Sequence, residues 1–548
     1  MRPADPQFGD FQANLALSLA KSSGRKPRDI AQAIVDQLAE DPVIERASVA
    51  GPGFINLALK DSAITRAVAD VWSDPRLGVP AAEHPDRVVV DYGGPNLAKE
   101  MHIGHLRSTI IGDALARVLR FAGHDVILQN HIGDWGTQFG MLLEHLIDSA
   151  WDRNQGHTLS DLNRLYQDAK ARFDREPAFA DRARKRVVKL QGGDEESLAF
   201  WRELIAESCA HMNEVFSRLG VLLSDADLRG ESFFNTRLPA VVADLRSAGV
   251  LVESDGAQVV FCDGFTNKDG APLPLIVQKS DGGYGYATTD LAAARFRIHE
   301  LGANRLVYVV DARQTDHFGM LFWTLKKSGW ARDSDKLDYV PFGAILGADK
   351  KPFQTRLGGT IKLAEVLDDA VTRARATLAE KGRDLAAAEL DQIARAVGTG
   401  AVKYADLSSD RVKDYVFDYE RMLSMDGNTA PYLQYAYVRV LSILRRADNH
   451  ALSAADLAIT DPVERQLMLQ LLRLPRLIQQ VVVSLEPHRL CTYLYEIASG
   501  VHQFHERCPV LKAPDPTTQQ SRLALSDLAA RTLKLALELL GVSVVDRM

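Results

Sequence analysis

The stretch RVVVDYGGPNLAKEMHIGHLRSTIIGD, residues 87–113, constrains the fold of this chain more than any other. Three valines at residues 88–90 form an apolar run bounded by turn residues, which is typical of a strand buried in a parallel sheet. Gly93, Gly94 and Pro95 end that strand. From residue 106 onward, aliphatic residues recur on one face of an amphipathic segment. The stretch therefore predicts a strand, a tight loop and a helix.

Two histidines lie where the predicted helix begins. Free backbone N–H groups and the helix dipole make such an N-terminus a binding place for phosphate. His102 and His105 are three positions apart and can both reach one anion, and Gly104 lets a ligand lie against the backbone. The alternative is two surface histidines that flank a glycine.

These residues resemble a known family. HIGH, residues 102–105, is the signature of class I aminoacyl-tRNA synthetases, and PNLAKEMHIGHLRST resembles its arginyl-tRNA synthetase version. NHIGDWGTQFG, residues 130–140, and the closing GVSVVDRM are also similar to that family, so the resemblance covers nearly the whole chain.

The resemblance and the patterning together predict a multidomain fold. We expect a small α/β N-terminal domain at residues 1–82 that contacts tRNA. A Rossmann-like, doubly wound parallel α/β catalytic domain follows at residues 83–375, with a helical connective insertion at about 145–275. An all-α anticodon-binding bundle follows at residues 376–548, where the apolar residues have helical period.

Composition excludes some classes of protein. The net charge of −7 over 548 residues means that a nucleic-acid partner must meet local basic patches. The four cysteines are scattered without a C-x-x-C pair, which argues against zinc or a disulfide framework. We see no signal peptide and no apolar run of transmembrane length, so we expect a cytoplasmic protein without membrane association. We also expect a monomer.

Polar residues also cluster where other predicted strands end. The loop after the second strand carries Asn130 and His131, and the strand at 306–310 is followed by Gln314 and His317. Ligands bind at the carboxyl edge of open parallel sheets. Asp290 belongs either to that site or to a plain helix N-cap, since we expect a helix to open at residues 288–290.

The resemblance implies a reaction in two steps. Arginine and ATP form arginyl-adenylate and pyrophosphate, and the arginyl group then passes to the terminal adenosine of tRNA(Arg). Magnesium is implied with the ATP phosphates. The catalytic residues would be His102, His105 and Lys99. The ATP-binding residues would be Pro95, His102, Gly104, His105, His317, Lys350, Lys351 and Arg356. The arginine-binding residues would be Asp91, Asn96, His131, Tyr286, Asp290 and Gln314, because carboxylates match a guanidinium and amides suit the amino-acid end.

Basic and aromatic residues are candidates for tRNA contact. Arg25 and Lys26 would meet phosphates, which position an RNA without reading its sequence. In APYLQYAYVRVLSILRRA the candidates are Tyr432, Tyr435, Arg439 and Arg446, since aromatics between basic residues suit splayed bases. The alternatives are a solvated loop for the first pair and ordinary helix core for the aromatics.

Two rival functions stay open. One is a class I enzyme for another amino acid, which an exchange assay over a panel of amino acids would reveal. The other is a non-catalytic RNA-binding paralogue, which would not charge tRNA.

The family's second motif, KMSKS, is absent and KKPFQTR, residues 350–356, occupies its place. If Lys99 supplies the missing point charge to phosphate, Lys99→Ala should lower the rate of adenylate formation and leave arginine affinity nearly unchanged. Pyrophosphate exchange and arginine titration measure the two quantities. A variant defective only in arginine affinity would assign Lys99 to the amino-acid pocket or to the fold.

Overall fold

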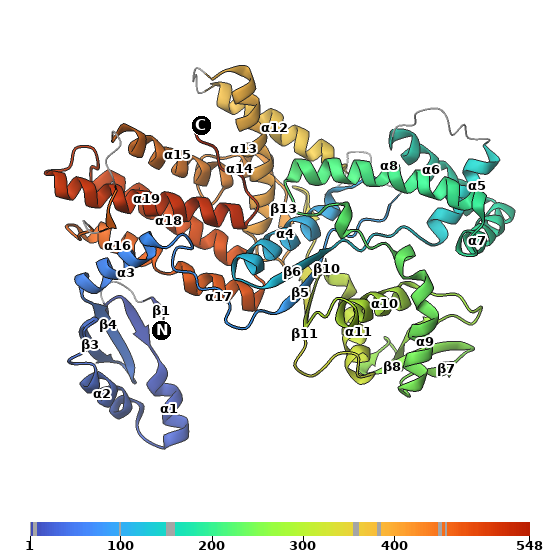
Figure 1. The fold of residues 1–548 in the computed structure, drawn as a ribbon, viewed down its shortest axis with the longest axis horizontal. Coiled ribbons are helices and arrows are strands. Elements are labelled where there is room, and N and C mark those ends of the chain that lie inside the picture. Colours follow the sequence, from blue (N-terminus) through green and yellow to red (C-terminus); the bar gives the residue numbers. More distant parts are fainter. Residues whose placement is uncertain are drawn as a thin grey trace. The chain divides into compact units, whose positions relative to one another are not determined.

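The computed structural model describes residues 2–3, 8–97, 100–149, 159–353, 361–380, 385–447, 452–454 and 457–548. The chain forms two compact units. The first comprises Met1–Pro80, Ala436–Leu477 and Tyr493–Leu535, and the second comprises Ala81–Tyr435, Ile478–Thr492 and Ala536–Met548. Figure 1 shows the elements coloured along the sequence. The division into 1–82, 83–375 and 376–548 stays a prediction.

The N-terminal part of the first unit is the expected small α/β domain. Its elements are β1 (Arg2–Pro3), β2 (Phe11–Ala13), α1 (Leu15–Ser23), α2 (Pro27–Gln37), β3 (Ile44–Ala50), β4 (Phe54–Leu59) and α3 (Asp61–Ser73). The strands form one antiparallel sheet in the order β1-β2-β4-β3. Helix α1 begins later than its apolar spacing suggests because residues 11–13 pair with β4 instead. Gly24 ends α1 in the left-handed conformation, with φ 67°.

A four-stranded parallel sheet organises the second unit. Its strands are β5 (Arg87–Asp91), β6 (Asp125–Gln129), β10 (Arg305–Asp311) and β11 (Lys336–Phe342), in the order β11-β10-β5-β6. From β5 the chain crosses through α4 (Leu106–Phe121) to β6, whereas β10 and β11 lie on the other side of β5. The strand order therefore reverses between β5 and β10, which is where open α/β sheets bind ligands.

Helices cover both faces of this sheet, as predicted. On one face α4 approaches the end of β5 so closely that a Cβ at Gly112 would lie 2.3 Å from Tyr92. On the other face, Val89 and Leu306 join an apolar core with Leu291 of α10 (Tyr286–His299) and Leu321 of α11 (Thr315–Lys327).

The predicted helical insertion follows β6. Its elements are α5 (Thr137–Asp148), α6 (Leu159–Arg175), α7 (Pro177–Gln191), α8 (Glu195–Leu219), two short 3₁₀ turns, η3 (Asp225–Asp227) and η4 (Glu231–Arg237), and α9 (Leu238–Ser247). Three strands then form a separate antiparallel sheet, namely β7 (Val252–Ser254), β8 (Ala257–Thr266) and β9 (Pro272–Gln278). Two more 3₁₀ turns, η2 (Ile103–His105) and η5 (Ala312–Gln314), directly precede α4 and α11.

The C-terminal part is helical with one exception. Its helices are α12 (Leu363–Glu380), α13 (Ala387–Leu407), α14 (Tyr419–Met422), α15 (Ala430–Arg446), α16 (Pro462–Leu471), α17 (Leu474–Ser484), α18 (His488–Arg507) and α19 (Pro516–Leu539). The expectation of helix alone was wrong at β13 (Tyr415–Val416), which pairs in parallel with β12 (Ile345–Leu346). This pairing ties the segment that enters the degenerate second motif to the helical region. Every helix in the described ranges is too short or too polar to cross a bilayer.

Candidate active site

The two HIGH histidines form a compact pair immediately before α4. The backbone N–H of His102 donates to His105 Nδ1 at 3.1 Å, and that of Gly104 donates to His102 Nδ1 at 3.1 Å. Their ring centroids lie 3.9 Å apart. Because each Nδ1 accepts a hydrogen bond, the neutral rings carry their hydrogen on Nε2 and can donate it to an anion. A Cβ at Gly104 would lie 2.8 Å from the His102 ring, so a side chain there would displace the histidine.

The chain that follows the second motif pairs directly with the histidine turn. Ile103 donates its N–H to the carbonyl oxygen of Ile361 at 3.0 Å, and Leu363 donates to Met101 at 2.9 Å. Lys362 forms an ion pair of 2.7 Å with Glu100. The sequence gives no local signal for this contact because more than two hundred residues separate its halves.

Of the second-motif residues, Lys350 and Lys351 are exposed in a tight turn. Lys351 accepts a hydrogen bond from Gly347 through its carbonyl oxygen at 2.8 Å, and Lys350 has φ 59°. The side chains of both lysines therefore leave the turn toward solvent. Lys99 and Arg356 lie outside the described residues.

The glycine-rich loop after β5 is fixed by buried side chains. The N–H of Gly93 donates to the Ser108 hydroxyl at 2.9 Å, which itself donates to the carbonyl oxygen of Val309 at 2.7 Å. The N–H of Gly94 donates to the Asn130 side-chain oxygen at 2.8 Å. These bonds connect the loop to the neighbouring strand ends and so define the path of the chain toward His102.

Pro95 and Asn96 lie beside the end of β6. Gly133 donates its N–H to the carbonyl oxygen of Pro95 at 3.1 Å, and Asn96 and Gly133 form an isolated parallel bridge. A Cβ at Gly133 would come within 2.1 Å of the Asn96 side-chain oxygen. Only glycine therefore lets the two loops approach this closely.

Asp290 is the centre of a second cluster. His317 Nε2 lies 2.7 Å from Asp290 Oδ2, and His131 Nε2 lies 3.5 Å from Asp290 Oδ1. The Tyr286 ring meets the His317 ring edge-on at a centroid distance of 5.0 Å. The structure thus brings together four predicted residues from the ends of three segments.

The N-cap alternative for Asp290 was wrong. Helix α10 begins at Tyr286, and its N-cap is Gly285 in extended conformation with φ −122°. The turn at residues 281–285 lets the helix start earlier than the threonine and aspartate signals suggest. Asp290 therefore lies inside the helix, where its carboxylate is not engaged in capping.

Two further residues belong to this region and were missed by sequence reasoning. Arg297 of α10 forms an ion pair of 2.8 Å with Asp91. Asp91, which we expect from the sequence to bind the substrate arginine, therefore already has a guanidinium partner within the protein. Burial, together with the negative charges of Asp290 and Asp134, raises the pKa of Glu231 to about 8. Neither residue belongs to a recognised motif. For Glu231 the available signal was the short polar stretch GES, residues 230–232, and Arg297 had no local signal.

Gln314 is exposed at the N-cap of α11. Its neighbour Arg313 forms an ion pair of 2.7 Å with Asp311, and the hydrogen bond from Arg313 holds the pKa of Asp311 below its usual range. Gln314 and His317 therefore lie on the first turn after β10, at the carboxyl edge of the sheet.

The tRNA candidates differ in exposure. Arg25 and Lys26 are exposed between α1 and α2. On α15, Tyr435 and Arg446 are exposed and Tyr432 is half-buried. Arg439 is exposed and lies 3.1 Å from His502 Nδ1. Exposure makes all six available to a partner to some degree.

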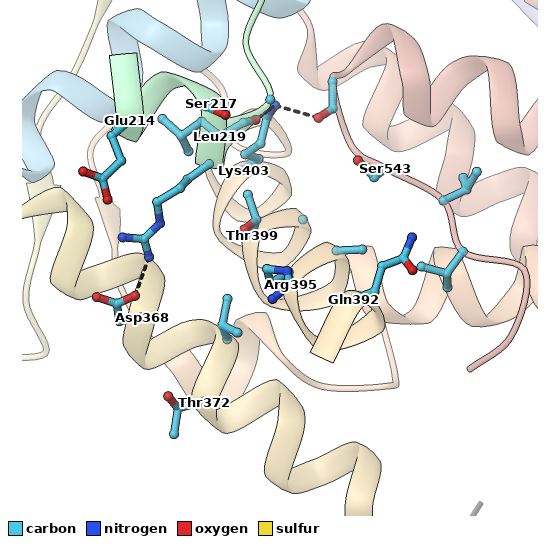
Figure 2. Close-up of a pocket in the computed structure, with 18 residues that line it drawn as sticks. Glu214, Ser217, Leu219, Asp368, Thr372, Gln392, Arg395, Thr399, Lys403 and Ser543 are labelled. Atoms are coloured by element: carbon cyan, nitrogen blue, oxygen red, sulfur yellow. Dashed lines mark hydrogen bonds and ion pairs between the residues drawn. The ribbon is translucent and has the colours of Figure 1, made fainter. Parts of the chain in front are cut away.

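A cavity lies elsewhere in the second unit (Figure 2). It has a volume of about 890 Å³ and is lined by the end of α8, by α12 and α13 and by residues 541–545. Lys403 donates to the carbonyl oxygens of Leu219 and Gly541 at 2.7 and 2.6 Å, and burial lowers its pKa to about 8. The lining contains none of the residues that the sequence predicts for the active site.

The described residues contain no group of three or more His, Cys, Asp or Glu side chains that could hold a metal ion.

Comparisons with known proteins agree with this geometry along the whole chain. Residues 67–419 match the family model "tRNA synthetases class I (R), catalytic domain", residues 433–548 match "DALR anticodon binding domain", and residues 1–59 match "Arginyl tRNA synthetase N terminal domain". A relative named Arginine--tRNA ligase from Frankia casuarinae is 52% identical and covers 100% of this chain and 94% of the relative. Another with the same name from Laribacter hongkongensis is 49% identical, with coverage of 100% and 96%.

Solved structures give the same result. The Plasmodium falciparum arginyl-tRNA synthetase matches with a TM-score of 0.87 at 30% identity, covering 100% of this chain and 94% of that one. The Thermus thermophilus arginyl-tRNA synthetase matches with a TM-score of 0.85 at 25% identity, covering 100% and 96%.

The switched parallel sheet with a histidine pair before α4 is the catalytic architecture of a class I aminoacyl-tRNA synthetase. Within that class, the chain belongs to the arginyl-tRNA synthetase family.

The histidine geometry yields a direct prediction. His105→Ala removes a preorganised donor and should lower adenylate formation by about a hundredfold or more. Pyrophosphate exchange in the presence of tRNA measures the rate, with the exposed His84→Ala as the matched control. Near-normal turnover of the His105 variant would exclude this histidine from the mechanism.

Proposed function

We propose that this protein is an ATP-dependent arginine–tRNA ligase that acts in protein synthesis. The observation that carries the proposal is that the His102–His105 pair and the carboxyl groups of Asp290 and Glu231 lie at the carboxyl edge of the sheet, near its switch point. Family membership over the full chain supports the same activity.

In the first step, an oxygen of the arginine carboxylate attacks the α-phosphorus of ATP and pyrophosphate leaves. Negative charge accumulates on the phosphate oxygens in the transition state. The Nε2–H groups of His102 and His105 and the N-terminus of α4 donate to those oxygens. This chemistry needs little proton transfer by the protein. Pro95 and Gly104 give ATP close access to the backbone, and His317, Lys350, Lys351 and Arg356 supply further donors.

In the second step, the 2′-hydroxyl of the terminal adenosine attacks the activated carbonyl carbon and AMP leaves. Lys99 acts in the first step, where it supplies a point charge to the ATP phosphates.

The arginine site combines acidic and amide groups. Asp290 and Glu231 receive the guanidinium, and Tyr286 and His131 line the same space. Asn96 and Gln314 bind the amino-acid end. Within the described ranges no lysine or arginine forms an ion pair with Asp290 or Glu231, so both carboxyl groups are available to a cationic substrate.

Magnesium would accompany ATP and neutralise part of the charge of its phosphates, and the described residues hold no cluster that would bind the ion by itself. The protein's own residues then contribute hydrogen bonds to the remaining oxygens.

The partner is tRNA(Arg), bound by phosphate contacts from Arg25 and Lys26 and by the α15 residues Tyr432, Tyr435, Arg439 and Arg446. The match of residues 433–548 to an anticodon-binding family supports Tyr435, Arg439 and Arg446, and Tyr432 directly precedes the matched residues. We further infer that the protein is a monomer, which sedimentation tests. We also infer that it works in the cytoplasm, where charged tRNA is used, and cell fractionation tests this.

A charging assay decides the function. Purified protein with ATP and tRNA should attach arginine and reject other amino acids in a panel. Exchange with a different amino acid, or no charging at all, would contradict the proposal.

Asp290→Asn tests the arginine site. The variant keeps the size of the side chain and removes its charge, so the Michaelis constant for arginine should rise at least tenfold because a charged hydrogen bond is lost. The constant for ATP should change little. The Michaelis constant for citrulline, the neutral isostere of arginine, should rise less than the constant for arginine does. The exposed Asp333→Asn is the control, and an unchanged constant for arginine in the Asp290 variant would remove it from the site.

Glu231 predicts a pH dependence. With its pKa raised to about 8, the carboxyl of the free enzyme is mainly protonated at pH 7. A bound guanidinium favours the charged form, so arginine binding releases a proton and the apparent affinity should strengthen as pH rises toward 8. The limiting slope is about tenfold per pH unit. Titration calorimetry in buffers of different ionisation enthalpy measures the released proton. Glu231→Gln should abolish that release, and equal release in the variant would assign the proton to another group.

A further inference from the structure

Three side chains from adjacent strands form a row across the parallel sheet. Tyr308 of β10 is in register with Asp91 of β5, which is in register with Gln129 of β6. Registered residues of parallel strands point to the same face. The row lies at the carboxyl ends of β5 and β6, next to the glycine loop that leads to His102.

Arg297 binds all three members of this row. Its Nη2 lies 2.8 Å from Asp91 Oδ2, its Nε donates to Gln129 Oε1 at 2.7 Å, and its guanidinium lies 5.0 Å from the centroid of the Tyr308 ring. Arg297 is only 1% exposed. Burial alone would lower the pKa of this guanidinium, but the charge of Asp91 raises it above its usual range. The guanidinium therefore keeps its charge, and removing Asp91 would leave that buried charge uncompensated.

The same helix carries a residue of the proposed arginine site. Asp290 and Arg297 are seven residues apart on α10, which places them two turns apart on one face. Arg297 fixes α10 to the strand ends, so it sets the position of Asp290 relative to the β5 loop.

Charge then distinguishes the two aspartates. Asp91 is neutralised within the protein, whereas Asp290 has histidine partners and Glu231 as an acidic neighbour. A substrate guanidinium at Asp91 would lie beside the Arg297 guanidinium in a buried environment, and like charges there repel strongly.

We propose that Arg297 is a positioning residue of the arginine site: it takes up the charge of Asp91 and fixes α10, so that Asp290 and Glu231 read the substrate guanidinium. This rests on the proposed assignment of Asp290 to the arginine site.

Arg297→Lys is the first test. Lysine keeps the charge but cannot hold Asp91 and Gln129 with one planar group, so the Michaelis constant for arginine should rise about tenfold. The constant for ATP should stay within about twofold. The matched control is Arg305→Lys. Arg305 is also buried and forms an ion pair of 2.7 Å with Asp338, but it lies at the amino end of β10, away from the carboxyl ends of the strands. The control should lower the melting temperature without changing either constant. If the Arg297 variant raises both constants equally, or changes only the melting temperature as the control does, Arg297 has a purely structural role.

Asp91→Asn tests the division of roles from the other partner. In a double-mutant cycle, Asp91→Asn should add little to the loss already caused by Arg297→Lys, whereas Asp290→Asn should multiply it. Asp91→Asn should also preserve the preference for arginine over citrulline, and Asp290→Asn should reduce it. Additive effects of Asp91→Asn and Arg297→Lys, or loss of that preference in the Asp91 variant, would overturn the proposal.

The two proposals fail differently. If Asp290→Asn leaves arginine kinetics unchanged, the assignment of the arginine site is wrong and the inference falls with it. If Asp290→Asn weakens arginine binding but Arg297→Lys does not, only the inference about Arg297 is wrong.

Discussion

The two-sided pairing of strand β5 is the constraint on which the rest of the catalytic unit depends. Residues 88–90 are at most 1% exposed and bond to β10 on one side and β6 on the other. A strand buried on both faces and both edges cannot slip in register without exposing apolar surface. Its carboxyl end is therefore a fixed point, and the glycine loop, the histidine pair and the start of α4 all follow from it.

Buried charges extend this fixed frame to the helices. Arg107, in the first turn of α4, pairs with Asp406 of α13 at 3.1 Å, and both side chains are almost fully buried. The same guanidinium donates to the carbonyl oxygen of Lys413 at 3.0 Å, next to β13. Since β13 pairs with β12, one arginine connects the histidine helix to the segment that enters the second motif. Removing a partner from such a pair costs about 3–5 kcal/mol, so these contacts define the geometry even where they add little net stability.

Local signals in the sequence were sufficient for β5, the glycine-rich loop and α4. The valine run, the Gly93–Gly94–Pro95 break and the apolar spacing after residue 106 correctly predicted β5, the loop and α4, because each depends on a few neighbouring residues. The beginning of α1 was misplaced because residues 11–13 satisfy their backbone in a sheet with β4, a partner more than forty residues away. β13 was missed for the same reason.

Partners of individual side chains were less predictable. Family likeness placed Asp91 and Asp290 in one pocket, but only the folded chain brings Arg297 to Asp91 and leaves Asp290 with His131 and His317. These pairings join segments that are far apart in sequence, and a single sequence contains no periodicity that specifies them. Glu231 is similar, since its raised pKa comes from burial and neighbouring charges that exist only after folding.

The short ladder between residues 101–103 and 361–363 has a consequence for how such a chain can vary. It closes the chain at the base of the histidine turn, so everything between these segments is topologically a loop with fixed ends. The entropy of closing a loop grows only with the logarithm of its length, at about 0.6 kcal/mol per doubling. Helices of this loop that carry none of the proposed site residues, such as α6 and α7, can therefore be lengthened or shortened at small entropic cost while the histidines keep their neighbours. The strands β6, β10 and β11 of the same loop cannot, because they fix the sheet on which the site is built.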